Sequence, residues 1–137
     1  MPEQDADLFI KLPARSENLS VIRHAVGNVA RQHGMGADGV ADLQIVVTEA
    51  CSNVVIHAYC DRPMGPLEVE ANCEASDFGI AVRDYGRGFR AATTETEGLR
   101  LGLALISTIA PSFDVAERRE GGVEVNMSLP FPRLSDP

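Results

Sequence analysis

A long apolar helix is the feature that most restricts how this chain folds. The segment from about Asp38 to Tyr59 places Leu43, Val47 and Val54 at the three- and four-residue spacing of an α-helix, so that they form one apolar stripe. Such a stripe is stable only when a second layer of structure covers it. We therefore expect a layered fold in which this helix packs on other elements of the chain.

The remaining segments supply those elements. Alternating or clustered apolar residues predict strands at 8–12, 67–71, 78–84, 113–117 and 123–129, with the second and third paired as a hairpin. A further helix is expected after Ser16 as N-cap, ending near Gly34, and another from Gly98 to Pro111. The order β-α-α-β-β-loop-α-β-β predicts an α+β fold, a two-layer α/β sandwich with a mostly antiparallel sheet and the helices on one face. A doubly wound parallel fold is disfavoured because strands and helices do not alternate throughout.

Composition narrows the class of protein. The 137 residues predict one domain over 1–130 and a proline-rich tail over 131–137, and 45% apolar residues form a core without disulfides or metal. The net charge of -8 argues against general nucleic-acid binding and against docking on anionic lipid. An acidic N-terminus and the short uncharged stretch 101–113 predict no leader and no membrane span, hence a cytoplasmic protein. Three cysteines without a C-x-x-C pair are expected to be reduced core thiols: Cys51, Cys60 and Cys73.

The long helix also carries polar residues beside its stripe. Glu49 and Asn53 lie one turn apart on one line, either as an ordinary surface pair or as a functional pair. In the functional interpretation Asn53 offers a hard oxygen to Mg²⁺ and Glu49 accepts a proton. His57 continues the line, but a zinc site is disfavoured because asparagine is a poor zinc ligand and the H-E-x-x-H spacing is absent. A histidine bonded to a backbone carbonyl at the helix end is the favoured interpretation for His57.

Two glycine-bearing segments follow. Asp84 ends a strand and precedes Gly86 and Gly88, whose freedom lets the backbone approach a ligand while the carboxylate accepts a hydrogen bond from an exocyclic amine. A simple Gly- and Asp-rich turn is the alternative. Farther on, Gly102 lies in a glycine-bearing entry to a helix, which is either an anion site or an ordinary connector.

Taken in this order, the three segments resemble the N, G1 and G2 boxes of the GHKL ATP-binding superfamily with its Bergerat fold. The string V-T-E-A-C-S-N-V-V-I-H-A-Y over 47–59 looks like the signature of the anti-sigma-factor serine kinases, the RsbW-like branch. The segments 12–19 and 121–127 also resemble that branch. The resemblance covers nearly the whole chain.

This resemblance implies an ATP- and Mg²⁺-dependent protein serine kinase. The residues that match the family pattern are Glu49 as general base, Asn53 as Mg²⁺ ligand, Asp84 as adenine reader, Gly86 and Gly88 as the turn beside the base, Gly102 as the phosphate-side glycine, and 90–97 as the lid. The implied partners are an anti-anti-sigma protein of STAS type, which carries the acceptor serine, and a sigma factor. A homodimer is a further expectation at the level of the family, for which the apolar edge of the first strand is suggestive.

The chain departs from the family pattern near Gly102. Arg100 stands where the family usually has a glycine, so its side chain is expected either to donate to a phosphate or to block the pocket. Glu95 and Glu97 in the lid would repel a triphosphate that they face. These departures motivate an alternative, a catalytically weak or inactive regulatory binding module with the same fold. Residues 83–100 nevertheless hold four arginines against three carboxylates, a local excess that suits a small polyanion such as ATP.

Overall fold

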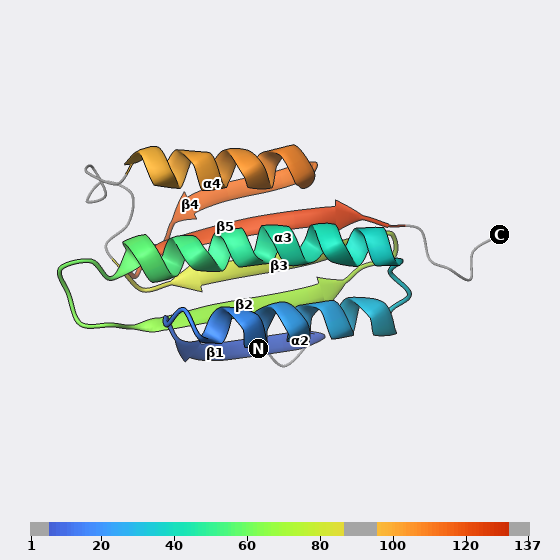
Figure 1. Cartoon of the computed structure of the whole chain (residues 1–137), viewed down its shortest axis with the longest axis horizontal. Coiled ribbons are helices and arrows are strands. Elements are labelled where there is room, and N and C mark those ends of the chain that lie inside the picture. The colour runs from blue at the N-terminus through green and yellow to red at the C-terminus, as the bar shows by residue number, and fades with distance from the viewer. Residues whose placement is uncertain (1–5, 87–95, 132–137) are drawn as a thin grey trace.

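A computed structural model describes residues 6–86 and 96–131 of the chain, with the side chains of 96–101 excepted. Five strands form one antiparallel sheet in the order β1-β2-β3-β5-β4, and three helices lie together on one of its faces (Figure 1). The strands are β1 (Leu8–Pro13), β2 (Pro66–Cys73), β3 (Asp77–Asp84), β4 (Ser112–Glu117) and β5 (Val123–Pro130). The helical elements are α2 (Asn18–Gln32), α3 (Ala37–Asn53), the π-helical turn η1 (Val54–Ala58) and α4 (Thr96–Ile109). The predicted α+β sandwich is confirmed.

The core lies between the sheet and the helix layer. Burial alternates along β3, where Phe78, Ile80 and Val82 are buried and the residues between them are more exposed. This alternation follows from the two-residue period of a strand, which sends successive side chains to opposite faces. Helix α3 packs between α2 and α4 and completely buries Leu43 and Val47 of its predicted stripe. The segment that most restricted the fold is therefore the central helix of the layer.

The same helix is apolar enough to be compared with a membrane-spanning segment. Within the 22 residues Ala37–Ala58, a window of 18 residues has a mean hydropathy of 1.3, so that by length and composition alone the segment could cross a membrane. In the fold this segment carries buried side chains of the protein core, including Leu43, Val46 and Val47. Such a pattern is typical of the core helix of a layered domain.

Two local predictions about the helices are wrong. Ser16 is not the N-cap of α2, because the helix begins at Asn18 with Glu17 in the cap position and without a side-chain cap hydrogen bond. The chain instead turns through backbone bonds, and the Asn18 side-chain amide donates to the Pro13 carbonyl at 2.8 Å. The second helix is not α-helical to Tyr59, since it widens into η1 after Asn53. Three successive β-branched residues in η1, Val54, Val55 and Ile56, weaken the α-helical preference there.

Burial also corrects the predicted cysteines and adds a core residue. Cys51 is fully buried as predicted, and burial raises the pKa of its thiol, but Cys60 and Cys73 are only half-buried. Phe131, placed in the tail by the sequence pattern, is 5% exposed and its ring packs edge-on against Phe78 with ring centroids 6.5 Å apart. The folded unit therefore includes Phe131.

The sheet topology gathers several chain segments at one end of the molecule. Because β3 runs antiparallel to both β2 and β5, the last residue of β3 lies near the first residues of those two strands. The carboxyl end of α3 and the turn η1 lie over the same end, as Figure 1 shows. The candidate site is built there.

Candidate functional site

Asp84 is a buried carboxylate at the end of β3. Its side chain is 5% exposed, and its Oδ1 accepts hydrogen bonds from the backbone N–H groups of Gly86 at 2.9 Å and Val123 at 3.2 Å. Burial raises the pKa of Asp84, while these two backbone donors and the charge of Arg118 oppose the rise. Both of these bonds end on Oδ1, so within the described residues Oδ2 is the oxygen that remains for a ligand donor. A carboxylate held in this way suits recognition of an amino group.

Close backbone approaches shape the surroundings of Asp84. A Cβ at Gly86 would lie 2.0 Å from the carbonyl oxygen of Ala58, which is the last residue of η1. A Cβ at Gly122 would lie 2.1 Å from the Asp84 carbonyl oxygen, and Gly122 also has a φ of 95°. Only glycine fits either position without displacing backbone. At these two glycines the backbone of η1 and the residue before β5 therefore pack directly against the end of β3.

Glu49 and Asn53 converge on Gly102 of α4. A Cβ at Gly102 would lie 2.9 Å from Glu49 Oε1 and 3.0 Å from Asn53 Oδ1. The absence of a side chain at this buried glycine therefore leaves the two polar groups room beside the α4 backbone. The predicted line of Glu49 and Asn53 faces α4, and both residues are half-buried beside it, an arrangement that favours the functional interpretation of the pair.

The polar groups at Gly102 fit a hydrated, oxygen-bound cation. Asn53 Nδ2 is buried and has no hydrogen-bond partner within the described part of the chain. A buried polar atom of this kind normally has a partner, and the two ends of an asparagine amide are exchangeable by rotation. One carboxylate and one amide oxygen are ligands that Mg²⁺ accepts together with water and phosphate oxygens. Glu49 and Asn53 would therefore suit a magnesium-bound phosphate group.

The turn η1 ends the line of the long helix. In a π-helical turn the hydrogen bonds run from residue i to i+5, so the residues after Asn53 leave the α-helical line on which His57 was expected. The turn instead carries the chain toward β3, where Ala58 meets Gly86. Wide turns of this kind are frequent at functional sites.

The structure brings together most, but not all, of the predicted residues. Glu49, Asn53 and Gly102 form one group, and Asp84 with Gly86 forms a second at the same end of the sheet. Gly88 and the lid residues 90–95 lie outside the described residues. Arg100 belongs to α4, but its side chain also lies outside the described part.

Other residues of the site were missed by the sequence analysis. Val123 supplies a donor to Asp84, Gly122 permits the contact, and Arg118 donates from Nη1 to the Asp84 carbonyl at 3.0 Å. The Arg118 guanidinium also lies over the Tyr85 ring, 4.2 Å from its centroid. Their one sequence signal was the Gly121-Gly122 turn, but the contacts cross more than thirty positions of the chain and depend on β5 lying beside β3.

Comparisons with known proteins find similarity over most of the chain. A family model described as the histidine kinase-like ATPase domain matches residues 12–129. The serine-protein kinase RsbW of Bacillus velezensis is 30% identical over 114 residues, covering 83% of this chain and 66% of that relative. The protein of the same name from Bacillus mycoides is 30% identical over 97 residues, covering 71% of this chain and 60% of its own length. The chain thus spans less than two thirds of the length of these relatives.

A solved structure shows the same fold. The crystal structure of the RsbU and RsbW domains of a Mycobacterium tuberculosis protein superposes with a TM-score of 0.71 at 20% identity. The match covers 92% of this chain and 33% of the other. At this identity the likeness concerns the fold alone.

Proposed function

Because this chain belongs to the histidine kinase-like ATPase family, we propose that it is an ATP-binding serine kinase that phosphorylates an anti-anti-sigma protein and sequesters a sigma factor. The observation that carries the proposal is the convergence of Glu49 and Asn53 on Gly102. The neighbouring buried carboxylate of Asp84 supports it, since that group suits an adenine amino group. The relatives named serine-protein kinase support the class of reaction.

Each residue then has a distinct task. Asp84 accepts a hydrogen bond from the adenine amino group, and Gly86 keeps the wall of the base pocket close. Gly88, Arg100 and the lid 90–97 complete the proposed nucleotide site. Asn53 would hold Mg²⁺, which when bound would neutralise charge on the phosphates. Glu49 takes the proton from the acceptor serine as its oxygen bonds to the γ-phosphorus, the bond to the bridging oxygen breaks and ADP leaves.

The proposed partners follow from the same family. An anti-anti-sigma protein of STAS type supplies the serine, and a sigma factor binds when that protein does not. A homodimer is proposed as well, since the edge strand β1 alternates in burial and exposes Phe9 by 37%. We propose that the protein works in the cytoplasm, where these partners are found.

Transfer of label from radioactive ATP to an anti-anti-sigma acceptor tests the proposal. We expect transfer by the unaltered chain and its loss in Glu49→Gln, with ATP binding retained because the amide keeps the size of the side chain. Asp42→Asn is the matched control, an exposed carboxylate on the same helix, and should transfer normally. Absence of transfer by the unaltered chain, or equal transfer by Glu49→Gln, would contradict the kinase. ATP binding without any transfer would favour the regulatory binding module.

A further inference from the structure

Tyr59 lies where three segments of the site meet. Its hydroxyl donates to the backbone carbonyl of Pro66 at 2.5 Å and accepts from the backbone N–H of Tyr85 at 2.9 Å. Tyr59 directly follows η1, Pro66 is the first residue of β2, and Tyr85 directly follows Asp84. One hydroxyl therefore joins the end of the long helix to both strands beside the candidate base pocket.

The sheet register shows what this hydroxyl does. Leu67 pairs with Asp84 in the β2–β3 ladder, so the next step along the two strands would bring Pro66 opposite Tyr85. The Tyr59 hydroxyl stands between the N–H of Tyr85 and the carbonyl of Pro66, where an antiparallel ladder would place a direct bond. Tyr59 thus holds the two strands apart immediately after Asp84.

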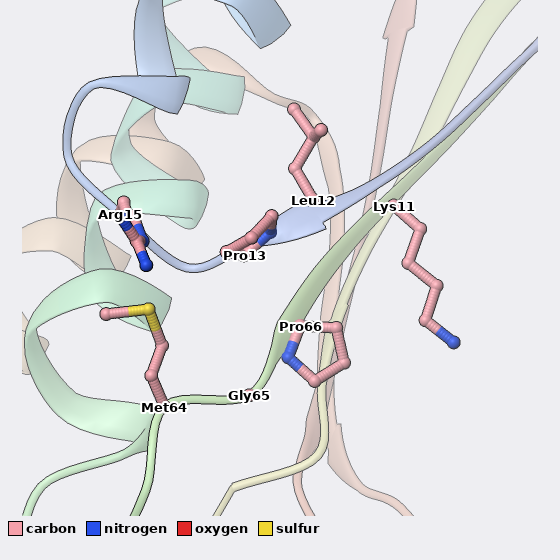
Figure 2. A pocket seen from close by; sticks show the side chains of 7 residues that line it. All are labelled: Lys11, Leu12, Pro13, Arg15, Met64, Gly65 and Pro66. Carbon is pink, nitrogen blue, oxygen red and sulfur yellow. The ribbon is translucent and has the colours of Figure 1, made fainter.

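Local packing fixes the ring that carries the hydroxyl. A Cβ at Gly65 would lie 2.5 Å from Tyr59 Cε1 and 2.8 Å from its hydroxyl oxygen, so the ring packs directly on the Gly65 backbone. Figure 2 shows Gly65 and Pro66 on the segment that enters β2, next to Pro13 at the end of β1. Burial is the main cause that raises the pKa of Tyr59, so the hydroxyl keeps its proton and remains a donor to Pro66 at neutral pH.

From this placement we infer that Tyr59 is a specificity-determining residue, which positions Asp84 to distinguish a 6-amino purine from a 6-oxo purine. The inference rests on the proposed ATP site. Tyr59 acts through backbone, because Tyr85 follows Asp84 and Gly86 donates to Asp84 Oδ1. Without the hydroxyl, the Tyr85 N–H either bonds directly to Pro66 or loses its partner, and in both cases the end of β3 moves relative to the base pocket.

Titration calorimetry with ATP and with inosine triphosphate, which has a 6-oxo group, tests the inference. We expect the unaltered chain to prefer ATP, and the preference to fall about fivefold in Tyr59→Phe, the effect of one hydrogen bond of ordinary strength. Tyr85→Phe is the matched control: it removes a hydroxyl that bonds to Glu68 and keeps the N–H that Tyr59 accepts. Its preference should not change.

A second variant tests the position of the ring without removing the hydroxyl. Gly65→Ala places a methyl group against the Tyr59 ring and should lower the ATP preference in the same way, whereas Gly36→Ala, where nothing lies within 4 Å, should not. Faster amide exchange at Gly86 and Val123 in Tyr59→Phe is expected, since both N–H groups donate to Asp84. A folded Tyr59→Phe protein with an unchanged preference for ATP would overturn the role of Tyr59 and leave the proposed function standing. Failure of the unaltered chain to bind ATP would refute the proposed function, and the selectivity role with it.

Discussion

Replacing Gly102 by alanine separates the stability of the fold from the function of the site. The new methyl carbon would lie 2.9 Å from Glu49 Oε1, 3.0 Å from Asn53 Oδ1 and 3.1 Å from Asn53 Nδ2. These atoms are the ends of flexible side chains, so they retreat by a few tenths of an ångström without moving backbone. The substitution therefore changes the site much more than it changes the core.

Two contributions of opposite sign act on the free energy of unfolding of Gly102→Ala. Alanine in place of glycine inside a helix such as α4 stabilises by about 1 kcal/mol, which offsets the cost of moving two side chains. We therefore expect the unfolding free energy to stay within about 1 kcal/mol of the unaltered value. Oxygen ligands of a metal tolerate shifts of only about 0.2 Å, so Mg-ATP should bind at least about tenfold more weakly, or about 1.4 kcal/mol.

Calorimetric titration with Mg-ATP and thermal unfolding of the same samples measure both effects. Gly79→Ala is the control, since its Cβ would make only ordinary contacts of 3.8 and 3.9 Å on β3. That variant should bind Mg-ATP normally. A Gly102→Ala protein that binds Mg-ATP with unchanged affinity would show that the Asn53 oxygen beside Gly102 does not hold the Mg²⁺ that accompanies ATP.

Three further changes test the surroundings of the site. Asp84→Asn should unfold at a higher temperature than the unaltered chain at pH 7 and yet lose ATP binding. Burial raises the pKa of Asp84 in the folded state, so ionisation of this carboxyl group opposes folding at neutral pH. The difference in melting temperature between the variant and the unaltered chain should therefore vanish as the pH falls toward 4. A difference that stays constant with pH would show that burial of the charge is not its cause. Gly122→Ala should destabilise more than Gly121→Ala in urea unfolding. Both residues have positive φ, but only the Gly122 Cβ would meet Asp84, at 2.1 Å from its carbonyl oxygen, so equal losses would show that backbone strain alone matters. Phe131→Ala should cost about 3 kcal/mol of unfolding free energy, as expected for a buried ring, and a loss below about 1 kcal/mol would place Phe131 outside the core.

Periodic patterns of apolar residues in the sequence predicted most of the fold. The spacing of Leu43 and Val47 identified the central helix, and the strand order with its turns identified an antiparallel sheet, because both depend on repeats along the chain that each element buries. Local details were less accessible. The cap at Ser16 was wrong and the π-helical turn was missed, since these features depend on how the ends of elements meet other segments.

In the candidate site, too, some features follow from local patterns in the sequence and others depend on the tertiary structure. The sequence by itself placed Glu49 and Asn53 on one line of a helix and Asp84 at the end of a strand, because helix and strand periods are local properties. The tertiary structure decided that this line faces Gly102, that Val123 donates to Asp84 and that the Tyr59 hydroxyl enters the sheet. These contacts join segments far apart along the chain, and they exist only because β5 lies between β3 and β4 and because the helices share one face of the sheet. No period along the chain encodes that order, which is selected by the packing of the whole core.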